Sequence, residues 1–420
     1  MPLGFCELFN YNKNMNCRIC NNKYLIEFCQ LGTQPLANSF IKKEDLSKKE
    51  KVFPLNLCLC QKCGLVQLSD VVPAKLMFKN YLYIPSASKT RIEHFNELAT
   101  TIKDMLNLNE NDLAVDIGSN DGSLLEVYTQ LGVKILGVDP SVNLAKVAEL
   151  KGIPTINDYF TRKTARKIIK KYGKPKAITA TNVFAHIDNI HEFVKGIEIL
   201  LADSGAFVIE FPYLVDFIEN CEYDTVYHEH LSYFGVRTLI KLFEKTSLEI
   251  FSIKRMRLDG GSLRVFVQKK KKNSKFYPEI ENLIKMELEH KFDTLIPYET
   301  FAKNVKKRKN TFLELLSKLK KKKKKIVGYG APAKGNTFLN YCKITTKDIW
   351  YIVDSTPFKQ GLFLPGTHIP IYHENKLLSD TPDYIVILAW NFAEEIIKKN
   401  ASLRKKGVKF ILPHQNFKVI

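Results

Sequence analysis

The chain has 420 residues, 45% of them hydrophobic, and a formal net charge of +20 at pH 7. Its length favours two or three domains over one small core, and it contains no uncharged apolar stretch of about 18 residues that could span a bilayer. The N-terminal sequence MPLGFCELFNYNKN lacks the basic and apolar regions of a secretion signal. We therefore expect a cytoplasmic protein that is not inserted in a membrane.

The positive charge is carried almost entirely by lysine. Ten arginines accompany 54 lysines, and the lysines bunch in the runs 269–272 and 318–325. Clustered cations displace counterions from nucleic acids, but lysine runs of this kind are more typical of solvated helix faces and linkers. We do not expect a nucleic-acid partner, although the charge favours a modest attraction to anionic substrates.

Residues 1–14 are expected to form a loose leader, to which we assign no role. The first predicted domain, 15–76, is rich in turns, with strand-like pieces such as PLNLCL and GLVQLS between paired cysteines. Each C-x-x-C pair presents two thiolates about one turn apart, which suits tetrahedral Zn²⁺. Four thiolates fill the coordination shell, so the metal should be structural. The expected ligands are Cys17, Cys20, Cys60 and Cys63.

One ligand position stays open at this point. Cys58 lies two residues before Cys60 and could take its place at the metal. Four further cysteines are isolated, and we interpret them as simple core residues: Cys6, Cys29, Cys221 and Cys342.

The second predicted domain, 77–255, begins with helical apolar spacing over 91–106 and then alternates strand and helix patterns. The strand candidates are LAVDIG, KILGVD, AITATNVF and GAFVIEF, and helices are expected from Leu124 and from Leu144. This alternation predicts an α/β domain of Rossmann type with a doubly wound, largely parallel sheet.

A cofactor site is predicted where the first two of these strands end. LAVDIGSNDGSLL places Asp116, Gly118 and Gly122 between a strand and a helix, and the glycines let the backbone approach a ligand closely. Asp139 ends the next strand and can accept hydrogen bonds from both ribose hydroxyls of an adenosine. A nicotinamide enzyme would normally begin with G-x-G-x-x-G, so the pattern favours S-adenosylmethionine. Further candidate contacts are Asn120, Asn182 and Asp158, the last of which could instead be a helix cap.

Two later segments carry side chains suited to proton transfer. His186 follows the fourth strand in TNVFAHID, and VYHEHLSYF places Tyr227, His228, Glu229 and His230 in one row. We interpret the second segment as an active-site lid. HEH could instead bind a metal, but adjacent side chains on one element rarely converge on a single ion. A purely structural role for one buried histidine is the other alternative.

The third predicted domain, 256–420, follows with a strand candidate LRVFVQ and a lysine-rich helical stretch over 280–325. KIVGYG, IWYIVD and DYIVILAW then predict a second Rossmann-like domain. Its loop GYGAPAKGNT offers backbone amides, Lys334 and Asn336 to a phosphate, and Asp354 ends the next strand as a ribose-binding acid would. Arg264 offers a planar fork to a diphosphate. A glycine loop of this kind also occurs merely to pack a helix against a sheet.

Taken together, the motifs resemble those of the zinc-containing sugar C-methyltransferases of deoxysugar pathways. The similarity runs from Cys17 nearly to the C-terminus and rests on CRIC, PLANSF, CQKCGLVQL, YLYIPSAS, DIGSNDGSLL, GVDPS, NVFAHI, VYHEHLSYF, DGGSLRVF and GYGAPAKGNTFLNY. The resemblance implies methyl transfer from S-adenosylmethionine to carbon 3 of a nucleotide-linked 4-keto-6-deoxysugar. It also implies that His230 is the base, in a site lined by Tyr81, His186, Tyr227 and Glu229.

The residue types fit carbon methylation on chemical grounds. A ketone at carbon 4 acidifies the proton on carbon 3, so a neutral histidine can remove it if hydrogen-bond donors stabilise the enolate. Tyr81 and Tyr227 can donate to the enolate oxygen, and Glu229 can orient an imidazole or bind a sugar hydroxyl. Methylation of oxygen or nitrogen would need fewer acid-base groups.

Two other function classes fit parts of the sequence. A zinc-containing RNA base methyltransferase predicts a basic groove interleaved with aromatic residues, and it has little need for a second Rossmann-like domain. A non-catalytic zinc-dependent interaction protein would not need an intact cofactor motif. We expect a nucleotide-linked sugar as the substrate, and the sequence carries no signal for the oligomeric state.

Overall fold

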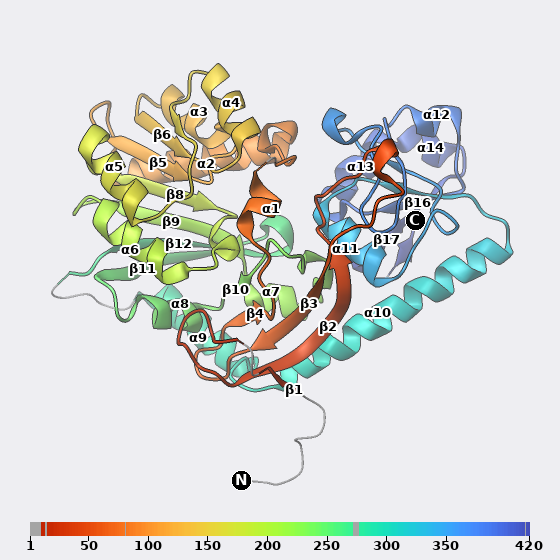
Figure 1. Ribbon diagram of the computed structural model, residues 1–420, viewed down its shortest axis with the longest axis horizontal. Coiled ribbons are helices and arrows are strands. Elements are labelled where there is room, and N and C mark those ends of the chain that lie inside the picture. Colours follow the sequence, from red (N-terminus) through yellow and green to blue (C-terminus); the bar gives the residue numbers. More distant parts are fainter. Residues whose placement is uncertain (1–9, 13–14, 80, 272–276, 416) are drawn as a thin grey trace, which may run out of the picture.

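The computed structural model describes residues 10–12, 15–79, 81–271, 277–415 and 417–420, and its strands form three β-sheets (Figure 1). Figure 1 shows two lobes side by side, one around the central sheet and one around the terminal sheet of the chain. Strands of the N-terminal sheet rise between them. No helix in the described part of the chain is both long enough and apolar enough to cross a membrane. Cys6 and most of the predicted leader lie outside the described residues.

The N-terminal sheet is antiparallel, with the strand order β1-β2-β3-β4-β10. Its strands are β1 (Asn10–Asn12), β2 (Leu25–Pro35), β3 (Val52–Leu59), β4 (Val66–Leu68) and β10 (Ser232–Tyr233). The strands expected in PLNLCL and GLVQLS are confirmed as β3 and β4. Because β1 pairs with β2, part of the expected loose leader is in fact a strand. β10 reaches this sheet from the predicted second domain.

The central sheet has seven strands in the order β11-β12-β9-β8-β5-β6-β7. They are β5 (Leu113–Ile117), β6 (Lys134–Val138), β7 (Thr155–Ile156), β8 (Ala177–Thr181), β9 (Ala206–Pro212), β11 (Leu248–Met256) and β12 (Ser262–Lys269). The five strands β5 to β9 are parallel, as predicted. β5, β8 and β9 are buried almost throughout, which is typical of strands covered on both faces.

The predicted domain boundary between 255 and 256 falls near the end of β11. β11 and β12 form an antiparallel hairpin, and β12 pairs with β9, so both strands belong to the central sheet. The strand expected in LRVFVQ is confirmed as β12, which pairs with β9 and extends the central sheet to Lys269.

Alternate residues of the central strands face two helix layers. α2 (Lys89–Leu106), α3 (Ser123–Gln130) and α4 (Val142–Leu150) share a core cluster with Ala114 and Val208. α5 (Arg162–Tyr172) and α6 (Ile190–Leu200) pack on the other face, with Val115 and Ile178. Three shorter helices complete this part of the chain: α1 (Ala74–Phe78), α7 (Leu214–Glu219) and α8 (Val236–Phe243).

The terminal sheet confirms the second Rossmann-like domain, with the strand order β15-β14-β13-β16-β17-β18. Its first five strands in this order are parallel, and β18 is antiparallel to β17. The strands are β13 (Ile326–Tyr329), β14 (Ile352–Val353), β15 (Ile371–Tyr372), β16 (Tyr384–Ile387), β17 (Lys409–Leu412) and β18 (Lys418–Val419). Its helices are α11 (Ala333–Tyr341), α12 (Lys376–Ser379), α13 (Ala393–Lys399) and α14 (Ala401–Lys405).

The lysine-rich stretch forms two helices, α9 (Pro278–Glu289) and α10 (Ile296–Lys321), instead of one. Pro297 lies in the first turn of α10, where proline is well tolerated because it needs no intrahelical donor there. In Figure 1, α10 runs along the base of the molecule to the terminal domain.

Candidate active site

The four predicted zinc ligands lie together in the structure. Their sulfur atoms are all within 4.8 Å of one another, with Cys17 Sγ 3.4 Å from Cys63 Sγ and Cys20 Sγ 3.5 Å from Cys60 Sγ. The second pair lies on a tight turn in which Gly64 has a φ of 77° and donates its N–H to the Cys60 carbonyl. Cys58 lies in β3 outside this group, opposite Gln67. Four converging thiols on two short turns fit a closed, structural Zn²⁺ site.

The loop between β5 and α3 has left-handed backbone at two glycines, where neighbouring side chains of the protein leave no room for a Cβ. Gly118 and Gly122 have φ values of 71° and 79°, and a Cβ on either would lie 2.3 Å from a side chain. Asp116, at the end of β5, is buried and accepts a hydrogen bond from Thr179 Oγ1 at 2.6 Å. Burial raises the pKa of Asp116 to about 7.

Asp139 holds this loop from the end of β6. Its carboxylate accepts the backbone N–H of Asn120 and of Ser141, each at 2.8 Å. Asn120 has a left-handed φ of 53°, and its side chain donates to the Tyr83 carbonyl. Asp139 therefore lies where the sequence predicts an acid for ribose hydroxyls.

The two weaker candidates differ in their placement. Asn182 ends β8 with a φ of 55° and donates its N–H to the Glu210 carbonyl, so it lies at the same carboxyl edge as Asp116. Asp158 is exposed, with Lys167 Nζ 3.9 Å away, and it accepts the neighbouring N–H of Tyr159.

A second group of side chains surrounds His230. The Nδ1 atom of His230 lies 2.9 Å from the Thr225 carbonyl oxygen, and a carbonyl can only accept, so Nδ1 carries the hydrogen. In neutral His230 the lone pair is then on Nε2, which accepts from the Tyr227 hydroxyl at 2.7 Å. The His186 ring stacks on His230 at 5.1 Å. Burial first, and then the charges of His186 and Lys334, lower the pKa of His230 well below its ordinary value.

Glu229 joins this group from its other side. It accepts hydrogen bonds from Tyr81 Oη at 2.8 Å and from Asn38 Nδ2 at 2.6 Å. Burial raises its pKa to about 7. The five residues that the family resemblance implies for the site, Tyr81, His186, Tyr227, Glu229 and His230, thus lie near one another, and Asn38 reaches them from the N-terminal module.

His228 points away from this group. Its Nε2 lies 3.2 Å from the Phe53 carbonyl in β3, and its ring meets the Phe53 ring edge-on. The three residues of HEH thus face different neighbours, which argues against a shared metal ion.

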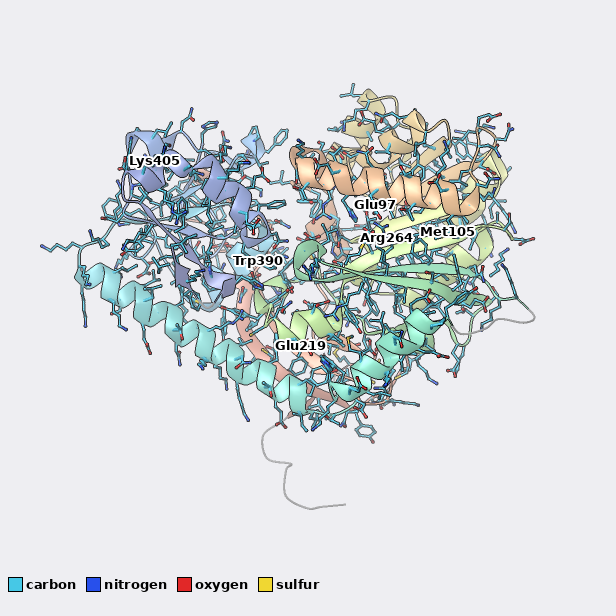
Figure 2. All side chains as sticks on the ribbon, turned by 180° about the vertical axis from the view of Figure 1, so that it is seen from behind. Glu97, Met105, Glu219, Arg264, Trp390 and Lys405 are labelled. Carbon is cyan, nitrogen blue, oxygen red and sulfur yellow. The ribbon has the colours of Figure 1, made fainter. Side chains whose placement is uncertain are left out.

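Lys334 extends from the first turn of α11 toward the central domain. Its Nζ lies 3.4 Å from the Asp259 carbonyl and 3.3 Å from Asn391 Oδ1, and it stacks over the Trp390 ring. Figure 2 shows Trp390 at the side of the terminal domain that faces the other lobe. The position of Lys334 is compatible with its predicted role at an anionic substrate.

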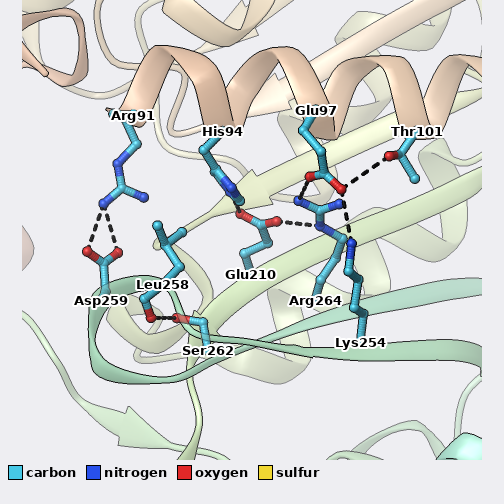
Figure 3. Close-up of polar contacts among 10 residues, drawn as sticks. All are labelled: Arg91, His94, Glu97, Thr101, Glu210, Lys254, Leu258, Asp259, Ser262 and Arg264. Carbon is cyan, nitrogen blue, oxygen red and sulfur yellow. Dashed lines mark hydrogen bonds and ion pairs between the residues drawn. The ribbon is translucent and has the colours of Figure 1, made fainter. Parts of the chain in front are cut away.

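Asp259 connects the two lobes. Both of its carboxylate oxygens accept from Arg91, at 3.0 and 2.7 Å (Figure 3). Its Oδ1 also accepts from Asn391 Nδ2. Burial opposes its ionisation, but Arg91 and Lys334 outweigh burial and lower the pKa of Asp259 to about 2. Arg91, Asp259, Asn391 and Trp390 were not among the predicted site residues, and only Asp259 lies within a motif of the family resemblance, DGGSLRVF.

Arg264 does not lie where a substrate could bind, contrary to its predicted role at a diphosphate. It is fully buried in β12, where it donates to Glu210 at 2.5 Å and to Glu97 at 2.6 Å (Figures 2 and 3). His94 also contacts Glu210, so the arginine belongs to an internal ion-pair network beneath α2. Its charge is satisfied inside the protein, and a diphosphate cannot reach it from solvent.

Asn336 and Asp354 also make internal contacts. Asn336 is buried and donates to the Ala37 carbonyl at 3.3 Å, so it faces the N-terminal module and not a phosphate. Asp354 accepts the N–H of Ala331 at 2.6 Å and of Thr356 at 2.8 Å. This is the same pattern that Asp139 makes with Asn120 and Ser141, on the corresponding strand of the other Rossmann-like domain.

Comparisons with known proteins agree with this geometry. Family models described as "C-methyltransferase C-terminal domain", "Methyltransferase domain" and "Putative zinc binding domain" match residues 257–414, 91–253 and 17–78. C-methyltransferase NovU of Streptomyces niveus is 34% identical over 404 residues, which cover 96% of each chain. The chain belongs to this C-methyltransferase family. It is an S-adenosylmethionine-dependent methyltransferase with a zinc-binding N-terminal module.

Similar solved structures include other methyltransferases. Magnesium protoporphyrin IX methyltransferase from Synechocystis PCC 6803, solved with bound S-adenosylmethionine, is 13% identical with a TM-score of 0.32, over 43% of this chain and 82% of its own. PH0226 protein from Pyrococcus horikoshii OT3 is 12% identical with a TM-score of 0.36, over 48% of this chain and 100% of its own.

Replacing Asp139 is expected to weaken cofactor binding by this C-methyltransferase. Asp139→Asn should lower the affinity for S-adenosylmethionine about 10- to 100-fold, because it removes charge-assisted hydrogen bonds worth about 1.5 to 3 kcal/mol. Asp112→Asn, at the opposite end of the sheet, is the matched control and should stay within about threefold. Isothermal titration calorimetry would measure both, and equal affinities in the two variants would contradict the role of Asp139.

Proposed function

We propose that this C-methyltransferase methylates carbon 3 of a nucleotide-linked 4-keto-6-deoxysugar. The observation that carries the proposal is the state of His230. Its Nδ1–H is fixed on the Thr225 carbonyl, its Nε2 lone pair points at Tyr227, and burial keeps the ring neutral. A neutral, oriented imidazole among hydrogen-bond donors is what removal of a proton next to a ketone requires.

The proposed reaction uses the residues in order. Nε2 of His230 takes the proton from carbon 3, and the electron pair moves to form the enolate. The hydroxyl of Tyr227, released from Nε2, donates to the enolate oxygen, and Tyr81 joins it when its hydroxyl turns away from Glu229. Burial raises the pKa of both tyrosines well above the ordinary value, so each keeps the proton it donates. S-adenosylmethionine supplies the electrophilic methyl group, which the enolate carbon attacks while S-adenosylhomocysteine leaves.

In this proposal the three parts of the chain divide the work. The module 15–76 holds zinc, the domain 77–255 together with β12 binds S-adenosylmethionine, and the remainder of 256–420 binds the nucleotide. The hydrogen bond from the Ala331 N–H to Asp354 supports the last assignment, because Asp139 accepts the equivalent hydrogen bond from Asn120 in the proposed cofactor site. Lys334 supplies the cation at the start of α11, where backbone amides also favour phosphate.

The test of the overall proposal is transfer of a labelled methyl group. Nucleotide-linked 4-keto-6-deoxysugars and RNA are each incubated with the enzyme and methyl-labelled S-adenosylmethionine. We expect incorporation into the sugar that resists acid and base cleavage, as a carbon–methyl bond does. Transfer to RNA, or a label that cleavage removes, would contradict carbon methylation of the sugar.

Lys334→Ala is expected to raise the Michaelis constant for the nucleotide-sugar about 10-fold, because a charge-assisted hydrogen bond to phosphate is lost. Affinity for S-adenosylmethionine should not change. Lys320→Ala is the control, since Lys320 pairs with Asp348 at 2.6 Å on the outer part of the terminal domain. Steady-state kinetics decide the matter: a loss of cofactor affinity with unchanged sugar affinity would mean that the domain roles are reversed.

A further inference from the structure

Arg18 connects the zinc centre to the active site. It lies between the ligands Cys17 and Cys20, and its side chain is only 5% exposed. Its guanidinium NH1 donates to the Leu231 carbonyl at 3.2 Å and to the Leu68 carbonyl at 3.1 Å, and Nε contacts Asp188 Oδ1 at 3.4 Å. One side chain from the first zinc turn thus contacts three other segments.

Two of these segments carry the histidines of the active site. Leu231 directly follows His230, and Asp188 lies two residues after His186. A backbone hydrogen bond from Leu231 N–H to the Ala185 carbonyl joins the same two segments at 2.9 Å. The guanidinium of Arg18 therefore contacts the residue after His230 and a residue two positions after His186, and these two histidine rings stack on each other.

The zinc turn fixes Arg18 from its other end. Its backbone N–H donates to Gln67 Oε1 at 3.0 Å, and the Ile19 carbonyl next to it contacts His191 Nε2 at 2.9 Å. A zinc ion with four thiolates carries net negative charge, which favours the adjacent guanidinium. The planar fork of arginine directs its donors to two carbonyls and a carboxylate in a fixed geometry, whereas the three donors of lysine rotate about a flexible stem.

We propose that Arg18 is a positioning residue. Anchored in the zinc turn, it sets the distance between His186 and His230 and the orientation of their rings. The inference rests on the proposed function, in which His230 removes the carbon 3 proton. The metal site then has a task in catalysis although none of its ligands touches the substrate. Asn38, which the same module places on Glu229, supports the opposite side of the site.

The test compares Arg18→Gln and Arg18→Lys with wild-type enzyme. Carbon 3 proton exchange is followed by NMR in deuterated water, with keto-sugar and S-adenosylhomocysteine present. Loss of an outer contact of this kind typically costs about 10- to 100-fold, so Arg18→Gln should slow exchange and kcat by that factor. Zinc content should stay near one equivalent, and the affinity for S-adenosylmethionine should not change. Arg18→Lys should recover part of the rate.

Two further variants separate positioning from a general loss of structure. Thr238→Val removes the hydrogen bond from Thr238 Oγ1 to the Cys63 carbonyl, a contact between the second zinc turn and α8 that does not involve the histidine segments. It should leave exchange within about threefold of wild type. Asp188→Asn changes a carboxylate that is 61% exposed, so folding should be unaffected, yet exchange should fall several-fold through the His186 segment.

The outcomes are distinct. Wild-type exchange in Arg18→Gln, or equal losses in Arg18→Gln and Thr238→Val, would overturn the positioning role while leaving the proposed function intact. Loss of zinc in Arg18→Gln would show that Arg18 holds the metal and would also overturn it. If Arg18→Gln does not fold, unchanged exchange in Asp188→Asn overturns the proposal. If the wild-type enzyme does not exchange the carbon 3 proton, the proposed function itself is contradicted.

Discussion

His230→Ala is expected to abolish exchange of the carbon 3 proton while leaving the affinity for S-adenosylmethionine unchanged. Loss of a general base typically costs about 10² to 10⁴ in rate, so both exchange and methyl transfer should fall by at least about 100-fold. The loss follows from the geometry, because Nε2 of His230 holds a lone pair whose direction is set by the Nδ1 contact with Thr225. Exchange in deuterated water isolates proton removal from the methyl-transfer step.

A matched control is available within the same three residues. His228→Gln keeps a donor for the Phe53 carbonyl, and His228 faces β3 rather than the active site, so exchange should stay within about threefold of wild type. Wild-type exchange in His230→Ala would contradict the assignment and turn attention to His186. Its ring lies 5.1 Å from that of His230, and burial lowers its pKa to about 4.

The combined variant Cys17→Ser plus Cys63→Ser is expected to lose zinc and most of its folded N-terminal module. Structural zinc in zinc-finger peptides binds with an apparent free energy of about 10 to 16 kcal/mol, and in such a site binding energy is folding energy. The effect should reach the active site, because Arg18 and Asn38 both come from this module. Metal analysis and thermal unfolding would measure both losses.

Cys58→Ser is the appropriate control for that experiment. Cys58 is a buried residue of β3, two positions from Cys60, and it lies outside the four-cysteine group. Its substitution should leave about one equivalent of zinc bound. Full zinc retention in the double variant, or zinc loss in Cys58→Ser, would overturn the ligand assignment.

Much of the fold and of the cofactor site could be predicted because the polar residues of the site lie directly at the ends of apolar segments that the sequence identifies as strands. The longer parallel strands of the central sheet are short apolar runs, and Asp116 and Asp139 stand at or just after the ends of two of them. Gly118 and Gly122, which the D-x-G-x-x-x-G pattern singled out, both have left-handed backbone. The two C-x-x-C pairs located the zinc ligands, although spacing alone left Cys58 and Cys60 as alternatives.

What could not be predicted depends on contacts between distant segments. An arginine in a strand has the same local pattern whether it faces a ligand or, as Arg264 does, two carboxylates of its own protein. β10 is only two residues long, which is too short to show the alternation of apolar and polar residues that predicts a strand. Asn38 and Glu229 meet across 191 positions of sequence, and Asn38 falls within a motif that suggested no chemical role.

The pairing of β4 with β10 has a consequence for synthesis of the chain on the ribosome. Roughly 160 residues separate the two strands, so at about 5 to 20 residues per second β4 waits about 10 to 30 s for its partner. Over that interval its open edge is a template for intermolecular pairing. All four cysteines emerge before the wait begins, so early metal capture can stiffen the nascent module. Cells short of zinc should therefore lose newly made chains to aggregation before β10 has been translated.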